Sequence, residues 1–240
     1  MMNAPTLHVI YRDNHLLVTA KSAGLLAQAD ETGDPDILTL GKRYLKETFN
    51  KPGNVYLGLV HRLDRPASGI MVLARTSKAA ARLTDQFKKH RPIKKYLAIV
   101  EGALEGNGAW EDHLIKDGRN VRVVSETHPK GKHASLAWRA LGRQGGATLV
   151  EVDLHTGRPH QIRVQFASRG YPLLGDLRYR AATPFDGQNL ALHSYFMELD
   201  HPTRREPIGW RLEPPPSWGS WFARERAELF DPDTSIPWPG

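Results

Sequence analysis

One carboxylate stands between two arginines in residues 61–69, whose sequence is HRLDRPASG. The carboxylate belongs to Asp64, and Arg62 and Arg65 flank it. Cationic neighbours attract a polyanion and screen its phosphates, and the small residues of the following turn leave room for a ring to approach. The segment therefore indicates an aspartate that meets a polyanionic substrate. The simpler interpretation is a surface segment of exposed ion pairs, which contribute little to stability.

Two further segments carry polar groups that their local pattern does not require. They are Lys94-Lys95-Tyr96 and residues 155–163, with the sequence HTGRPHQIR. In the second segment Ile162 begins the apolar face of a short helix, which places Arg163 beside that face. A guanidinium there would be partly buried and would need an anion, for which Asp64 is the obvious candidate. The alternative is that Arg163 pairs with another acid as a purely structural contact.

In this order the segments resemble the RluA family of RNA pseudouridine synthases, whose signature is HRLD followed by a small turn. The resemblance begins at residues 13–25, where Lys21-Ser22-Ala23-Gly24 is similar to the family's Lys-Pro-x-Gly, and it ends at Asp176. Two long motifs in the right order are far more specific than either one alone. Ser22 in place of a common Pro and Ala67 in place of a common Thr bear on fine geometry and substrate preference.

The resemblance implies roles for three side chains. Asp64 is the catalytic aspartate, Tyr96 lies against the target uracil, and Arg163 is the partner of the carboxylate. Isomerising uridine breaks the glycosidic bond, turns the uracil and rejoins it through carbon, so an ionised Asp64 can act as nucleophile. Whether Asp64 attacks the ribose or the base is left open, as is whether the Tyr96 hydroxyl or a water takes the released proton. This chemistry requires no metal, and we predict no cofactor.

A base inside folded RNA must be extruded before Asp64 can reach it, which costs roughly a few kcal/mol. Arg62 is placed to fill the space left in the stack, and lysines near Tyr96 would hold phosphates, although helix ends also carry lysines for dipole reasons. For His61 and His160 we favour structural hydrogen bonds over proton transfer. The predicted RNA-contacting residues are His61, Arg62, Arg65, Lys94, Lys95, Arg158 and His160.

Composition agrees with an RNA partner. The 240 residues carry a formal net charge of +7 and contain no cysteine, which excludes disulfides, thiolate nucleophiles and cysteine-based zinc sites. No signal-like N-terminus and no stretch near the roughly 18 apolar residues of a membrane span is present. We therefore expect a soluble, cytoplasmic, monomeric protein without an obligate protein partner, acting on ribosomal or transfer RNA as the resemblance implies.

Short apolar runs between turn signals predict strands, and helical spacing predicts helices near residues 38–49 and 76–89, with a short one after residue 157. Thr76 or Ser77 would cap the second helix. We predict an α+β class with a large mixed, mainly antiparallel sheet flanked by helices, in one pseudouridine synthase-like domain over residues 1–240. Residues 212–240 would form a Pro- and Trp-rich tail packed on it, and no N-terminal RNA-binding module is expected. The predicted strands cover residues 7–11, 15–20, 56–60, 70–74, 94–100, 121–124, 134–141, 147–154 and 189–199.

Three alternative functions are disfavoured by the sequence. A glycoside hydrolase would need a second carboxylate about 5 to 10 Å from Asp64, in place of Arg163. A non-catalytic RNA-binding or RNA-folding factor would keep the basic surface, but a buried acid would hinder its binding. A metal hydrolase would need an acidic cluster beside its histidines, and the pairs His128 with His133 and His155 with His160 are five apart, which is wrong for one helix face.

Overall fold

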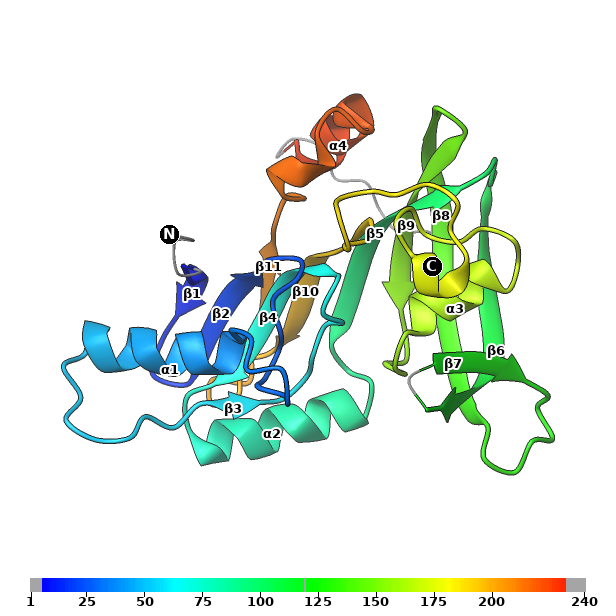
Figure 1. Ribbon diagram of the computed structural model, residues 1–240. Helices are drawn as coiled ribbons and strands as arrows, with labels where there is room; N and C mark the ends of the chain where they lie inside the picture. Colours follow the sequence, from blue (N-terminus) through cyan, green and yellow to red (C-terminus); the bar gives the residue numbers. More distant parts are fainter. Residues whose placement is uncertain (1–5, 119, 232–240) are drawn as a thin grey trace.

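The computed structural model describes residues 6–118 and 120–231, and a single continuous sheet of eleven strands runs through this part of the chain (Figure 1). The strands are β1 (His8–Arg12), β2 (Leu16–Lys21), β3 (Gly58–Leu59), β4 (Ser68–Ala74), β5 (Ile93–Glu101), β6 (Asn107–Asp117), β7 (Asn120–Val124), β8 (Lys132–Gln144), β9 (Ala147–Leu154), β10 (Leu192–Asp200) and β11 (Pro207–Arg211). Their order is β1-β2-β4-β10-β5-β9-β8-β6-β7, with β3 on β4 and β11 on β10. Only β4 with β10 is parallel among these pairs, so the predicted mixed, mainly antiparallel sheet is confirmed.

Helices cover both faces of the sheet. They are α1 (Ile37–Thr48), α2 (Ser77–Lys88), α3 (Gln161–Ala167) and α4 (Ala223–Phe230), with short 3-10 turns η1 (Leu177–Tyr179) and η2 (Pro216–Trp218). On one face Leu45 of α1 and Phe166 of α3 belong to the same apolar cluster. On the other face Leu83 of α2 and Trp218 of η2 pack in two separate clusters. None of the helices in the described ranges is long and apolar enough to cross a membrane.

The cap of α2 follows from its sequence. The side-chain oxygen of Thr76 accepts the backbone N–H of Ala79 at 3.1 Å and satisfies one of the free donors of the first turn. Thr76 is therefore the cap, as one of the two predicted candidates. The apolar residues Ala79 and Leu83 then face the sheet, which is the spacing from which the helix was predicted.

Three elements were not predicted from the sequence. Strand β6 mostly alternates exposed and half-buried residues and has no apolar run. It forms a strand because its backbone pairs with β8 and β7. Strand β11 is likewise mostly exposed. Helix α4 lies in the segment expected to be a tail, whose Trp218 and Phe222 are each about 1% exposed against the sheet. Residues 232–240 of that segment lie outside the described part of the chain.

The parallel contact between β4 and β10 is short and tight. It consists of Ser68 opposite His193 and Gly69 opposite Ser194. Gly69 has a φ of +129°, and a Cβ at this position would lie 2.4 Å from the backbone nitrogen of Ser194. Only glycine fits there without displacing the neighbouring strand. The loop that contains Asp64 leads directly into this contact.

Candidate functional site

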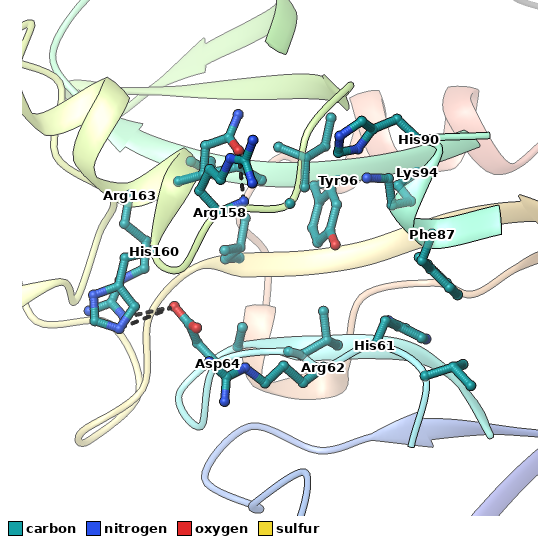
Figure 2. Close-up of a pocket in the computed structure, with 18 of the residues that line it drawn as sticks. His61, Arg62, Asp64, Phe87, His90, Lys94, Tyr96, Arg158, His160 and Arg163 are labelled. Atoms are coloured by element: carbon teal, nitrogen blue, oxygen red, sulfur yellow. Dashed lines mark hydrogen bonds and ion pairs between the residues drawn. The ribbon is translucent and has the colours of Figure 1, made fainter. Parts of the chain in front are cut away.

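A hollow of about 460 Å³ lies between the loop before β4, the end of α2, strand β5 and the start of α3. Figure 2 shows Asp64, His160 and Arg163 gathered at one end of it, with Tyr96 in the middle and Lys94 and His90 beyond it. Asp64 is the acidic residue among those that line the hollow, and several arginines and lysines line it as well. These are Arg62, Lys88, Lys94, Arg158 and Arg163.

Arg163 holds two carboxylates at once. Its Nη1 donates to Oδ2 of Asp64 at 2.9 Å, while its Nε and Nη2 donate to the two oxygens of Asp176 at 2.7 and 2.8 Å. Burial by itself would lower the pKa of Arg163, but the hydrogen bonds and charges of Asp176 and Asp64 raise it above its ordinary value. The predicted contact between Asp64 and Arg163 is therefore present, with a fully charged guanidinium.

The two carboxylates differ in access. The Asp64 side chain is 27% exposed, whereas that of Asp176 is 1% exposed and both of its oxygens accept from Arg163. Asp176 thus fixes the guanidinium, and Asp64 is left facing the hollow. Asp176 was not predicted as a site residue. The available signal was an acid after the apolar pair Leu173-Leu174 and Gly175, a setting in which a buried acid needs a partner.

Tyr96 forms part of the wall beside Asp64. It lies on β5 in the apolar cluster that also contains Leu63 and Leu192. Burial raises the pKa of Tyr96 to about 12, and the nearby charge of Asp64 acts in the same direction. The hydroxyl is therefore protonated at neutral pH, so the side chain presents a neutral ring to the hollow.

His160 lies at the start of α3, in a left-handed conformation with a φ of +50°. Its Nδ1 is 2.9 Å from the hydroxyl of Tyr179, and its Nε2 is 3.9 Å from Oδ2 of Asp64, which is too long for a hydrogen bond. Burial lowers the pKa of His160 against the opposing charge of Asp64. The Tyr179 ring also lies 5.2 Å from the guanidinium carbon of Arg163. This histidine has a clear structural contact beside the acid.

His61 supports the same loop from the other side. Its Nε2 accepts the backbone N–H of Val72 at 2.9 Å, and its ring stacks on Phe87 with centroids 4.8 Å apart. Burial, together with the charge of Lys94, lowers the pKa of His61 to about 3. The imidazole is therefore neutral and acts as an acceptor for β4.

Lys21 ties the loop to β2. Its Nζ donates to the carbonyl oxygens of Ser22, Arg65 and Ala67 at 3.1, 3.0 and 2.7 Å. The residue is 1% exposed, and burial lowers the pKa of Lys21 to about 7 although the charge of Asp64 opposes this shift. The sequence showed this lysine only as part of a motif. Its structural role is to fix the backbone on the C-terminal side of Asp64.

Most of the predicted site residues line the hollow. They are His61, Arg62, Asp64, Lys94, Tyr96, Arg158, His160 and Arg163. Arg65 lies outside its wall, pairs with Asp34 at 2.6 Å and lines a second hollow that shares Arg62 and Asp64. Lys95 lies on a third hollow, beside Asp153. Phe87 and His90 line the main hollow although neither was predicted to belong to the site.

Comparison with known proteins places the chain in a family. The family described as RNA pseudouridylate synthase matches residues 15–168. "Ribosomal large subunit pseudouridine synthase D" of Xanthomonas campestris pv. campestris is 34% identical over 215 residues, which are 84% of this chain and 64% of that protein. The protein of the same name in Pseudomonas aeruginosa is 32% identical over 93% of this chain and 74% of its own length. The chain thus spans 64% of the length of the first of these relatives.

Two solved human structures share the fold. RNA Pseudouridylate Synthase Domain Containing 4 superposes with a TM-score of 0.73 at 21% identity, over 92% of this chain and 91% of that one. RNA Pseudouridylate Synthase Domain Containing 1 gives a TM-score of 0.69 at 23% identity, over 90% and 87%. At these identities the similarity concerns the fold, and it extends over most of both chains.

Proposed function

The chain belongs to the RluA family of RNA pseudouridine synthases, and we propose that it isomerises specific uridines in RNA to pseudouridine with Asp64 as the nucleophile. One observation carries the proposal. Asp64 has a carboxyl group that faces a hollow and is held by a guanidinium, which is itself fixed by a buried acid. A nucleophile needs this combination of access and orientation.

The proposed reaction is balanced without any other reactant. The Asp64 carboxylate attacks the ribose or the uracil ring, and the bond between the ribose anomeric carbon and the ring nitrogen breaks. The uracil turns within the hollow, and a new bond forms between the anomeric carbon and a ring carbon. That carbon loses its proton, the nitrogen gains one, and the carboxylate is released unchanged. Arg163 keeps one oxygen of Asp64 in place throughout, because Asp176 holds the guanidinium from its other side.

We propose that Tyr96 contributes its ring to this reaction. A phenol with a pKa of about 12 cannot accept a proton at neutral pH without passing on its own. The flat, neutral ring in the wall of the hollow suits a detached uracil, and a water is the simpler acceptor for the proton leaving the ring carbon. Histidines in the wall are poorer candidates, since burial lowers the pKa of both His61 and His160 and each has a structural contact.

The target base would reach this hollow by leaving its stack. Arg62 is exposed next to Asp64 and lines both the main hollow and the second one. A cationic side chain at this junction can occupy the vacated position in the stack and offset part of the cost of unstacking, roughly a few kcal/mol. We propose this role for Arg62, with Arg65, Arg158, His160 and the lysines of β5 contacting the RNA around it.

For the substrate we propose large-subunit ribosomal RNA, acted on in the cytoplasm, because relatives that match most of this chain carry that substrate in their names. Transfer RNA is the alternative substrate. A non-catalytic RNA-binding factor is the competing function. It is disfavoured by the open carboxylate, which would repel phosphates without any compensating use. A glycoside hydrolase is also disfavoured, since the second acid near Asp64 is Asp176, whose oxygens are both taken by Arg163.

The decisive experiment maps pseudouridine across total RNA from cells with and without this protein. The purified chain is then incubated with unmodified transcripts of large-subunit ribosomal RNA and of transfer RNA. We expect loss of pseudouridine at defined ribosomal positions in the deleted cells and its formation in the ribosomal transcript. Unchanged RNA in both assays, together with tight binding to the transcript, would overturn the proposal in favour of the binding factor.

A further inference from the structure

Lys94 is a buried cation at the end of the hollow opposite Asp64. It is 7% exposed, lines the hollow, and lies on the same face of β5 as Tyr96, two residues along the strand. Figure 2 shows it beyond the Tyr96 ring, next to His90. Within residues 6–118 and 120–231 its ammonium makes no hydrogen bond or ion pair. Because the side chain is mostly removed from water and its ammonium is unpaired among the described residues, an anion that enters the hollow would make a favourable contact there.

The charge of Lys94 acts on two histidines in the wall of the hollow. Burial lowers the pKa of Lys94 to about 8, and its charge in turn lowers the pKa of both His61 and His90, second to the effect of burial. The acid with an opposing influence is Asp153. Asp153 is opposite Lys95 in the register, and the side chain of Lys95 points to the opposite side of β5 from that of Lys94, so Asp153 does not occupy the space in front of Lys94.

Arg158 brings a second cation to the same hollow from a separate loop. Its Nε donates to the carbonyl oxygen of His133 at 2.8 Å, and its backbone N–H donates to the side chain of Gln161 at 3.0 Å. These contacts fix the guanidinium while its Nη groups form no hydrogen bond in the described part of the chain. The charge of Arg158 also reaches His90, where it lowers the pKa of that imidazole further.

We propose that Lys94 and Arg158 form an anion subsite that binds a backbone phosphate of the RNA next to the extruded uridine. The inference rests on the proposed function, because it places the uracil between Tyr96 and Asp64. With the base there, the sugar-phosphate backbone must leave the hollow along its wall. Figure 2 shows Lys94 beyond the Tyr96 ring and Arg158 on the other side of that ring, and the charges of both residues act on His90. A phosphate held between these two cations would set how deeply the nucleotide enters and which uridine is aligned with Asp64.

The first test measures RNA binding at several salt concentrations. The probe is an oligoribonucleotide of large-subunit ribosomal RNA containing the uridine that the wild-type chain modifies. Lys94→Met removes the charge and keeps the length of the side chain, and Lys78→Met, at an exposed position in the first turn of α2, is the matched control. For Lys94→Met we expect weaker binding, a salt slope reduced by about 0.7 and an increased KM with little change in the single-turnover rate. Lys78→Met should match the wild type.

The second test locates the phosphate. Each linkage around the target uridine is replaced singly by a neutral methylphosphonate. One linkage should weaken binding to the wild type by about tenfold, the effect of one charge-assisted contact, and have no further effect on Lys94→Met. Arg158→Gln is carried through the same series and should couple to the same linkage. It keeps the inference testable if Lys94→Met fails to fold by circular dichroism.

The outcomes separate the two proposals. If the wild type forms pseudouridine in the probe but Lys94→Met and Arg158→Gln bind like Lys78→Met, and no linkage couples to either, the subsite is refuted and the function stands. If the wild type forms no pseudouridine in any ribosomal or transfer RNA, the proposed function falls and the subsite falls with it.

Discussion

Each face of the sheet has a carboxylate paired with an arginine. One of these carboxylates is accessible to solvent and the other is buried. On the face of the hollow, Arg163 joins Asp64 and Asp176. On the other face, Glu151 of β9 contacts Arg139 and accepts the hydroxyl of Tyr195. The Asp64 side chain is 27% exposed and that of Glu151 is 1% exposed. The second cluster lies under the C-terminal segment, where Tyr195 packs against Phe230.

The difference distinguishes the proposed nucleophile from a structural acid in this fold. Both acids are paired, and both belong to elements that pack in the core. Glu151 has its oxygens taken by Arg139 and Tyr195, so nothing can approach it. Asp64 has one oxygen held by Arg163 while its carboxylate lines a hollow. A buried ion pair alone is therefore weak evidence of function, whereas an acid held from one side and open on the other is strong evidence.

The largest expected effect comes from neutralising each acid. Asp64→Asn should lower pseudouridine formation by about 1000-fold or more, because the nucleophile is gone, with RNA affinity and melting temperature nearly unchanged. Glu151→Gln should have a lower melting temperature, but below that temperature its rate of pseudouridine formation should match that of the wild type. Release of tritium from uridine-labelled RNA measures the first property and thermal denaturation the second. A fully active Asp64→Asn variant would refute the assignment.

Replacing the arginine partner of each acid tests the same difference between Asp64 and Glu151. Arg163→Leu leaves the buried Asp176 without its two donors, so we expect a loss of about 3 to 5 kcal/mol in the free energy of unfolding together with loss of activity. Arg139→Leu should cost less, because its side chain is 16% exposed and Tyr195 still donates to Glu151. Its activity should remain. Urea denaturation and the tritium assay on both variants test this, and an unaffected rate in Arg163→Leu would remove Arg163 from the mechanism.

The two buried tyrosines offer a smaller comparison. Tyr96→Phe keeps the ring in the hollow, so we expect the turnover rate to fall by less than about tenfold if the hydroxyl does not take the proton. Tyr195→Phe removes a donor to Glu151 and should cost about 1 to 3 kcal/mol of stability without changing turnover. Single-turnover rates between pH 6 and 9 distinguish the cases. A drop of 1000-fold in Tyr96→Phe would give the hydroxyl a direct part in proton transfer.

The last prediction concerns the effect of pH on stability through Lys21. Its pKa is lowered by burial from 10.5 to about 7 in the folded chain. Between these values the unfolded chain binds more protons at this lysine, so its contribution makes stability rise with pH, by at most about 1.4 kcal/mol per pH unit. The free energy of unfolding of the wild type minus that of Lys21→Met should therefore increase from pH 7 to pH 10. A difference that falls over this range would contradict the assignment.

The sequence predicted those parts of the site that rest on local pattern. Arg163 was recognisable because helical spacing placed a guanidinium beside an apolar face, and the cap Thr76 because a polar residue preceded an apolar helix. Lys21 was not assigned a role because it meets the backbone of Arg65 and Ala67 only after β2 has paired with β4. Asp176 lies only 13 residues from Arg163, but Asp64 had already been taken as the partner of that guanidinium, and the pattern did not show that one arginine would bind two acids. Strand β6 was not predicted because its extended conformation depends on pairing with β7 and β8 and not on an apolar pattern of its own.

The position of β10 bears on when a newly made chain becomes reactive. This strand is among the last parts of the sheet to be synthesised, yet it lies between β4 and β5. It pairs with β4 through only two pairs of residues. Until it is in place, the Asp64 loop has no fixed relation to the guanidinium that must orient it. If Asp64 is the nucleophile, we expect a growing polypeptide that still lacks β10 to leave the uridines of the surrounding ribosomal RNA unmodified.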